Sequence, residues 1–157
     1  MKRILLLLIL TVSASFLWGQ SNELLDSFLS KEKADVATTM LLVAQSAGLL
    51  PHDASPQDGY SWAISEKFGK HVKKFKADEP VTLGLFYLAL FKTWNVKGGL
   101  MYSMTGAPRY AAKEAGFLGY VEPSELYPNR TVPPYEVLTG ISYVSADFAE
   151  GGNTDEK

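Results

Sequence analysis

Side chains that commonly perform catalysis or bind metals are sparse in this chain of 157 residues. It has no cysteine, which excludes thiolate metal sites, disulfides and cysteine nucleophiles. His52 and His71 are the only histidines, and His52 with Asp53 has no third ligand at a suitable spacing. No G-x-S-x-G motif precedes a predicted helix. We therefore expect both histidines at the surface, and neither a metal site nor a cofactor.

Two glutamates could support one class of reaction. Glu125 and Glu136 would form a glycan-hydrolysing pair if a cleft held their carboxylates about 5–10 Å apart. Surface charge explains Glu125 as well, and a place in the first turn of a helix explains Glu136. The sequence therefore favours a protein that is not an enzyme, with a glycan-acting hydrolase as an alternative.

Residues 119–131 combine aromatic and polar side chains in a segment rich in glycine and proline. Tyrosine has a large apolar area and a polar tip, which suits it to binding surfaces. Proline restricts the backbone and lowers the ordering cost of binding. We predict a binding loop whose contact residues are Tyr120, Tyr127, Asn129 and Arg130. Alternatively, the two tyrosines fold over Phe117 and Leu126 as a lid on the core.

The stretch KHVKKFKAD, residues 70–78, is the most basic part of the chain. One interpretation is a binding face for an anionic polymer or a lipid headgroup. The other is a solvated helix end whose lysine stems lie over Val72 and Phe75. The absence of arginine weakens the first interpretation. The candidate contact residues are Lys70, Lys73, Lys74 and Lys76.

Composition and charge narrow the class of protein further. The apolar fraction of 46% and the charged fraction of 20% are those of a globular chain, and the length suits one domain. The formal net charge of -2 makes nucleic acid a poor partner, because phosphate binding needs a basic excess.

The first residues have the form of a secretion signal. Lys2 and Arg3 precede an apolar run from Ile4 to Val12, and small residues follow. We expect cleavage after Gly19, or alternatively after Ala14. The apolar run is shorter than the ~20 residues of a membrane span, which argues against a retained anchor. The expected organisation is a signal peptide at 1–19, one domain at 20–146 and a disordered acidic tail at 147–157, with no transmembrane span in the mature chain.

Apolar periodicity predicts a mainly α-helical domain. Helices are expected over residues 21–29, 33–47, 60–68 and 79–94 and from Pro134 onward, with a loop over 51–59. The apolar residues from Leu100 to Met104 are expected to fill the core.

The order of these elements suggests an internal repeat. Trp62-Ala63 and Tyr110-Ala111 each open a short helix, and these helices stop at Gly69 and Gly116. Each pair follows the start of a longer helix at nearly the same spacing, and a further long helix begins at Pro134. This alternation predicts a small helical-repeat domain of long and short helices joined by Gly/Pro-rich loops.

Residues 109–144 resemble the S-layer homology repeat, which pairs an aromatic-Ala short helix with a loop and a longer helix opened by a hydrophobic-Thr-Arg-x-Glu motif. About two degenerate units are covered. Pro133 and Pro134 stand where the motif has Thr and Arg, and Leu83 replaces the Arg in the earlier unit. The matching residues in the later unit are Tyr110, Ala111, Gly116, Gly119, Pro128, Asn129, Val132 and Glu136.

The resemblance implies docking onto cell-wall polysaccharide through clefts between repeats. The motif arginine belongs to that site and is absent from both units, so the resemblance supports the fold more than the activity. The sequence therefore predicts an exported, periplasmic or envelope-associated module that binds a cell-wall polymer or an envelope protein. The alternative is a structural subunit of an envelope assembly, in which residues 100–104 close a symmetric contact between copies.

Overall fold

The structure, a computed structural model, describes the backbone of residues 23–150 and the side chains up to Phe148. The predicted signal peptide at 1–19 lies outside the described residues, as does the part of the predicted tail from residue 151 onward. The described chain is mainly α-helical, as the sequence predicts, and its only β-type pairings are two isolated bridges. None of its helices is long and apolar enough to cross a membrane.

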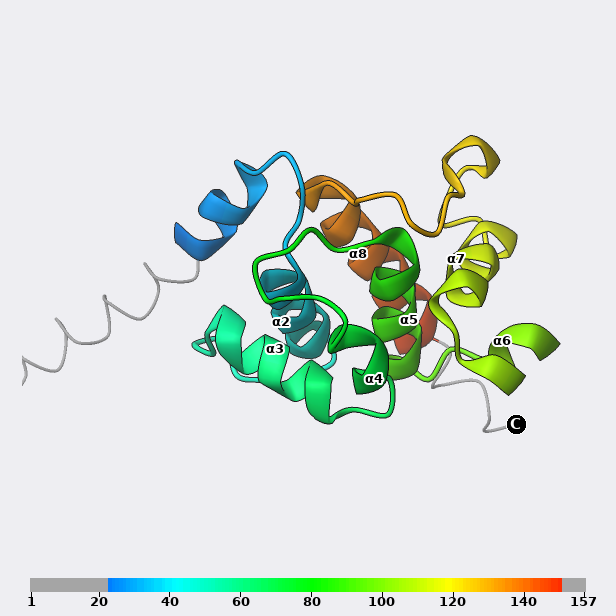
Figure 1. Cartoon of the computed structure of the whole chain (residues 1–157), viewed down its shortest axis with the longest axis horizontal. Helices are drawn as coiled ribbons and strands as arrows, with labels where there is room; N and C mark the ends of the chain where they lie inside the picture. The colour runs from blue at the N-terminus through cyan, green and yellow to red at the C-terminus, as the bar shows by residue number, and fades with distance from the viewer. Residues whose placement is uncertain (1–22, 151–157) are drawn as a thin grey trace, which may run out of the picture.

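A helical segment at residues 23–29 precedes the labelled helices. The longest helices, α2, α5 and α8, are separated by shorter ones (Figure 1). The bounds are α2 Val36–Ser46, α3 Pro56–Ser65, α4 Gly69–Val72, α5 Leu83–Thr93, α6 Leu100–Thr105, α7 Pro108–Phe117, the 3-10 turn η1 Pro123–Glu125 and α8 Pro134–Glu150.

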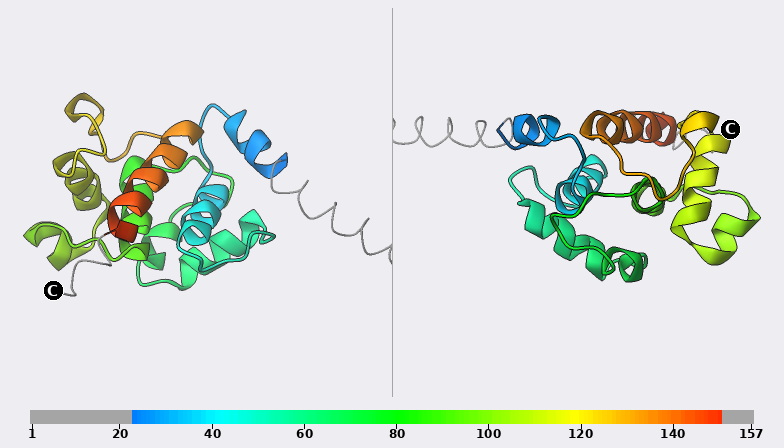
Figure 2. Two further views of the ribbon diagram at one scale, coloured as in Figure 1. Left: turned by 180° about the vertical axis from the view of Figure 1, so that it is seen from behind. Right: turned by 45° about the horizontal axis from the view of Figure 1, so that its top comes forward.

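Helix α5 forms the centre of the core. Every residue from Leu83 to Phe91 is buried, as expected for a helix that is apolar nearly all round. Helices α2 and α8 also contact α5, while α7 packs closely along it and α3 packs along α2. Figure 2 shows α3 and α4 on one side of the molecule and α6 and α7 at one end.

The chain segments that lead into α2, α5 and α8 meet in a closed ring of backbone hydrogen bonds. The N–H of Ala34 donates to the carbonyl of Val132 at 2.9 Å, that of Val132 to Val81 at 3.1 Å, and that of Val81 to Ala34 at 2.8 Å. All three residues are fully buried. This backbone ring therefore places the starts of the three longest helices side by side.

Two helices begin where the sequence did not predict it. Helix α3 begins at Pro56, within the expected loop, because Ser55 and Asp58 form a capping box. Helix α5 begins at Leu83, four residues later than expected, because Val81 is held extended in the backbone ring and Thr82 caps the helix. Between residues 60 and 93 the structure has the rest of α3, the short helix α4 and α5, so Gly69 begins α4 instead of ending the helix before it.

The prediction that residues 100–104 fill the core is wrong. In α6 only Tyr102 is buried, while Leu100 and Met104 are about three-quarters exposed, at 74% and 73%. Gly106 adopts a left-handed conformation at φ 55° and reverses the chain into α7, so α6 contacts the body of the protein with one face only.

Candidate functional site

The loop at residues 119–131 is tied at its far end to the body of the protein through its backbone. The N–H groups of Leu83 and Gly84, at the start of α5, donate to the carbonyls of Arg130 and Pro128, each at 2.9 Å. These N–H groups have no partner within their own helix, so the loop satisfies them. The end of the loop is therefore placed by the most buried helix of the domain.

The side chain of Arg130 fixes the same end of the loop a second time. Its two terminal nitrogens donate to the two carboxylate oxygens of Glu136, at 2.9 and 2.5 Å. Its Nε donates to the carbonyl of Glu125 at 2.6 Å. Both charged side chains are only about one-fifth exposed, so solvent screens this bidentate pair weakly. We call this arrangement the Arg130 clamp.

Tyr120 belongs to the core rather than to a free surface. Its ring stacks on that of Tyr87, with centroids 6.5 Å apart and an angle of 10° between the planes. Its hydroxyl donates to Oδ2 of Asp147 at 2.6 Å. Burial raises the pKa of the Tyr120 hydroxyl, and the hydrogen bond to Asp147 raises it further. The lid alternative therefore describes Tyr120 in part, although Phe117, which the lid was expected to cover, is 86% exposed.

Tyr127 and Asn129 lie on the outer side of the loop. Tyr127 is 67% exposed and Asn129 is exposed, and within residues 23–148 no side-chain hydrogen bond holds either of them. The backbone turn between them is closed by the N–H of Arg130, which donates to the carbonyl of Tyr127 at 3.0 Å. Of the four predicted loop residues, two are thus available for contact and two hold the loop in place.

The carboxylates of Glu125 and Glu136 both lie beside Arg130. Nε of Arg130 is 3.7 Å from Oε2 of Glu125, whereas both oxygens of Glu136 already accept hydrogen bonds from the guanidinium. A general acid or nucleophile needs an oxygen free for the substrate. Glu136 therefore acts as the structural partner of Arg130, and neither of its oxygens is free to take part in hydrolysis.

The basic segment lies in and after α4. Lys70, Lys73, Lys74 and Lys76 are all exposed, while Val72 is fully buried beneath them. His71 is partly buried, and its Nε2 has no hydrogen-bond partner among the described residues. Burial lowers the pKa of His71, and the charges of Lys70 and Lys74 lower it further. The positive charge of this surface near neutral pH therefore comes from the lysines.

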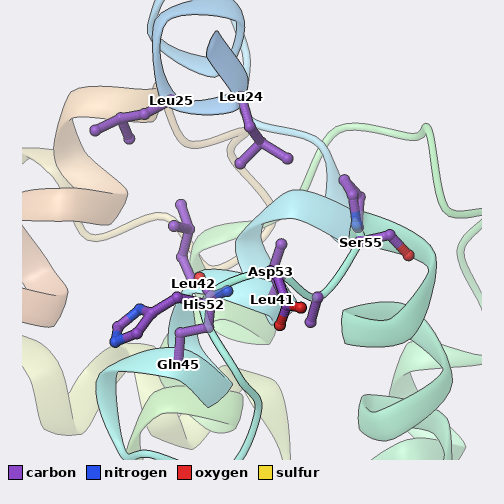
Figure 3. A pocket seen from close by; sticks show the side chains of 10 residues that line it. Leu24, Leu25, Leu41, Leu42, Gln45, His52, Asp53 and Ser55 are labelled. Carbon is purple, nitrogen blue, oxygen red and sulfur yellow. The ribbon is translucent and has the colours of Figure 1, made fainter. Parts of the chain in front are cut away.

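A groove that the sequence did not indicate lies between the helical segment at 23–29 and α2 (Figure 3). Its volume is about 270 Å³. Its apolar walls are Leu24 and Leu25 on one side and Leu41 and Leu42 on the other, and its polar rim comes from Gln45, His52, Asp53 and Ser55. The sequence alone does not indicate this groove, because the groove forms only when the helical segment at 23–29 packs with Leu24 and Leu25 opposite α2.

Among the described residues, no group of His, Asp or Glu side chains is arranged to hold a metal ion. The groove and the loop are instead surfaces with apolar area and a few polar groups, an arrangement suited to non-covalent binding. Comparison with known protein families, curated proteins and solved structures finds no match to this chain.

Proposed function

We propose that this protein is an exported, non-enzymatic module of the cell envelope that binds a cell-wall polymer or an envelope protein. Binding uses the loop at 119–131 and the grooves between the helical units. The observation that carries the proposal is the placement of Tyr127, which is 67% exposed at the edge of a loop fixed by the Arg130 clamp.

A fixed loop favours binding because little conformational entropy is lost when the partner arrives. The loop is held by its own prolines, by the clamp and by hydrogen bonds to the start of α5. A tyrosine ring offers a flat apolar face for a sugar ring or a peptide side chain, and its hydroxyl adds a hydrogen bond. Asn129 supplies further donors and acceptors beside it.

The groove beside α2 is the proposed second contact. Its leucine walls and its rim of Gln45, His52, Asp53 and Ser55 combine apolar area with orienting polar groups. A polymer could bind this groove and the loop at separate points along its length. The overall affinity would then exceed that of either contact alone.

The resemblance to S-layer homology repeats is part of this proposal. The backbone ring supports it, because the three longest helices start from one shared junction, as related units of a repeat would. The motif arginine is absent from both units, so wall binding here would depend on the loop and not on that arginine.

The test is co-sedimentation of the purified protein with isolated wall sacculi, alongside Tyr127→Ala and Asn129→Ala. The matched control is Tyr143→Ala, an exposed tyrosine on α8. We expect the loop variants to lose most of the bound fraction and the control to keep it. Pull-down on envelope extracts distinguishes a protein partner from the polymer. Recovery of neither partner would refute the proposal.

The basic segment makes a separate contribution if the partner is anionic. Surface charges are screened over ~8 Å at physiological ionic strength, so its contribution should fall steeply with added salt. Replacing Lys73 and Lys74 by glutamate should remove that salt dependence. Salt-insensitive binding would show that these lysines are only a solvated surface.

A further inference from the structure

Helices α6 and α7 form one end of the molecule (Figures 1 and 2). Five large apolar side chains of α6, of α7 and of the residue after α7 are exposed. Phe117 and Leu100 protrude most, at 86% and 74% exposure. Isolated exposed apolar residues are ordinary, but such a cluster is typical of an interaction surface. The α6–α7 face, as we call it, consists of Leu100, Met101, Met104, Phe117 and Leu118.

The packing of the two helices explains why these side chains point outward. Helix α7 buries Ala111, Ala112 and Ala115, so its opposite side faces water. Arg109, Lys113 and Phe117 follow one another at four-residue intervals and are all exposed, as expected for one outer stripe. Two cations and one large apolar ring thus share this stripe.

The surroundings of the α6–α7 face are basic. From residue 92 to residue 121 the chain has four basic residues and one acidic residue, although the whole chain has a net charge of -2. Glu114, the acidic residue, is partly buried and lies close against Gly98 and Gly99. The basic residues, Lys92, Lys97, Arg109 and Lys113, are all exposed.

A groove between the two helices adds to the apolar surface. Its volume is about 300 Å³, and Met101, Tyr110 and Phe117 are among the residues that line it. Nζ of Lys113 lies 5.9 Å from the centre of the Tyr110 ring, at the border of the groove. One lysine therefore lies beside the apolar side chains that line this groove.

We propose that the α6–α7 face docks on the surface of an anionic lipid bilayer. Leu100, Met104 and Phe117 would enter the boundary between headgroups and acyl chains, while Arg109 and Lys113 contact lipid phosphates. This combination of exposed apolar side chains and flanking cations is the one that holds peripheral proteins at membrane interfaces. The long lysine stems allow their ammonium groups to stay among the headgroups.

The charges argue for lipid over a second copy of the chain. A two-fold contact places the same patch on both subunits, so it would gather Arg109 and Lys113 of both copies in one interface. Like charges brought together in this way oppose association. An anionic bilayer offers apolar contact and charge complementarity at the same surface.

The absence of cysteine makes a site-specific test possible. In the full chain, Met104→Cys provides a single thiol for an NBD fluorophore, and Ser61→Cys on α3 provides the control position. Vesicles of phosphatidylglycerol and phosphatidylcholine should shift the emission of the label at residue 104 to the blue and raise it. The label at residue 61 should not respond, even if the apolar N-terminal segment binds lipid.

Matched variants test the two components of the face. Leu100→Ala with Phe117→Ala should weaken vesicle binding roughly tenfold or more, whereas Leu49→Ala, which also removes an exposed apolar side chain, should not. Arg109→Glu with Lys113→Glu should weaken it roughly tenfold or more. The same reversal at Lys73 and Lys74 should weaken binding less than the reversal at Arg109 and Lys113. Urea unfolding checks that each variant is folded.

Several results would overturn the proposal. One is an unchanged emission at residue 104 with anionic vesicles, and another is equal binding to pure phosphatidylcholine. A larger loss with the Lys73 and Lys74 reversal would assign lipid binding to the basic segment. Lipid-free self-association in sedimentation velocity that disappears in the Leu100→Ala, Phe117→Ala variant would show that the face joins copies of this chain.

Discussion

Arg130 and Glu136 form a bidentate ion pair across the junction between the loop at 119–131 and α8, with N–O distances of 2.9 and 2.5 Å. Because Arg130 also donates to the carbonyl of Glu125, one side chain connects the 3-10 turn, the end of the loop and the first turn of α8. The loop thus depends on a single guanidinium for much of its side-chain support.

Replacing Arg130 by methionine should lower the free energy of unfolding by about 1–3 kcal/mol, because charge-assisted hydrogen bonds are lost and Glu136 stays partly buried without its partner. Urea unfolding measures this change. Arg109→Met is the matched control, since Arg109 is exposed on α7. Equal effects of the two substitutions would show that the clamp adds no stability.

Replacing the two loop tyrosines should have different effects on the stability of the protein. Tyr120→Ala removes a ring stacked on Tyr87 and a hydrogen bond to Asp147, so we expect a loss of roughly 2–4 kcal/mol. Tyr127→Ala removes a side chain that is 67% exposed, so the change should stay within about 0.5 kcal/mol. Thermal unfolding of both variants provides the comparison. A large loss from Tyr127→Ala would mean that this ring is structural.

Three tyrosines should make the protein sensitive to alkali. Burial raises the pKa of Tyr87 and of Tyr120 above the ordinary value, and burial with the nearby Glu114 raises the pKa of Tyr102 to about 12. The unfolded tyrosines lose their protons near pH ~10. Their contribution to stability is therefore complete below that pH and is lost as the pH rises through the folded pKa values.

Absorbance at 295 nm and unfolding at a series of alkaline pH values test this expectation. Tyr102→Phe should reduce the alkaline loss, because it removes one of the three groups. The Tyr102 hydroxyl is buried and has no partner among the described residues, so this substitution should leave stability at neutral pH unchanged or raise it. A clear loss at neutral pH would reveal a hydrogen bond to water or to the rest of the chain.

Gly59 permits the close packing of α3 on α2. A Cβ atom at this position would lie 2.5 Å from both the backbone nitrogen and the Cα of Leu41. Gly59→Ala should therefore lower stability by about 1–3 kcal/mol, which outweighs the ~1 kcal/mol gain in helix propensity. Ser61→Ala, at an exposed position of the same helix, is the control for urea unfolding. A stabilised Gly59→Ala variant would contradict this packing.

His71 should titrate below its ordinary range. Burial lowers its pKa first, and Lys70 and Lys74 lower it further, so the imidazole stays neutral near neutral pH. Stability from His71 is present above the unfolded pKa of ~6.5 and is lost as the pH falls through the folded value. An NMR titration should show a higher His71 pKa in Lys74→Ala than in the wild type. An unchanged His71 pKa would show that the charge of Lys74 does not lower it.

Local patterns predicted the helices well and their packing poorly. The helix expected over 33–47 ends close to its predicted boundary, and Gly48 just after α2 has a φ of 68°, because the chain reverses there. The start of α3 at Pro56 was missed, although the signal is local, since Ser55 and Asp58 form a capping box. The start of α5 at Leu83 was not, because the ring that holds Val81 joins three distant segments.

The candidate site was predictable as a segment but not residue by residue. Composition singled out the loop, yet the partners of Tyr120 and Arg130 lie on α8, and no spacing rule brings Asp147 or Glu136 to them. Leu100 was expected in the core because apolar residues are usually buried. Its exposure depends on the turn at Gly106, which allows α6 only one contact face.

The backbone ring also orders events during synthesis. A nascent chain that has left the ribosome only as far as α5 can join Val81 to Ala34, but Ala34 still lacks the carbonyl of Val132. Contacts between residues far apart in sequence close late in folding, since they require the largest loss of chain entropy. The core can therefore be completed only after Val132 and α8 have emerged. Until then the chain stays incompletely folded and accessible to proteins that bind unfolded polypeptides.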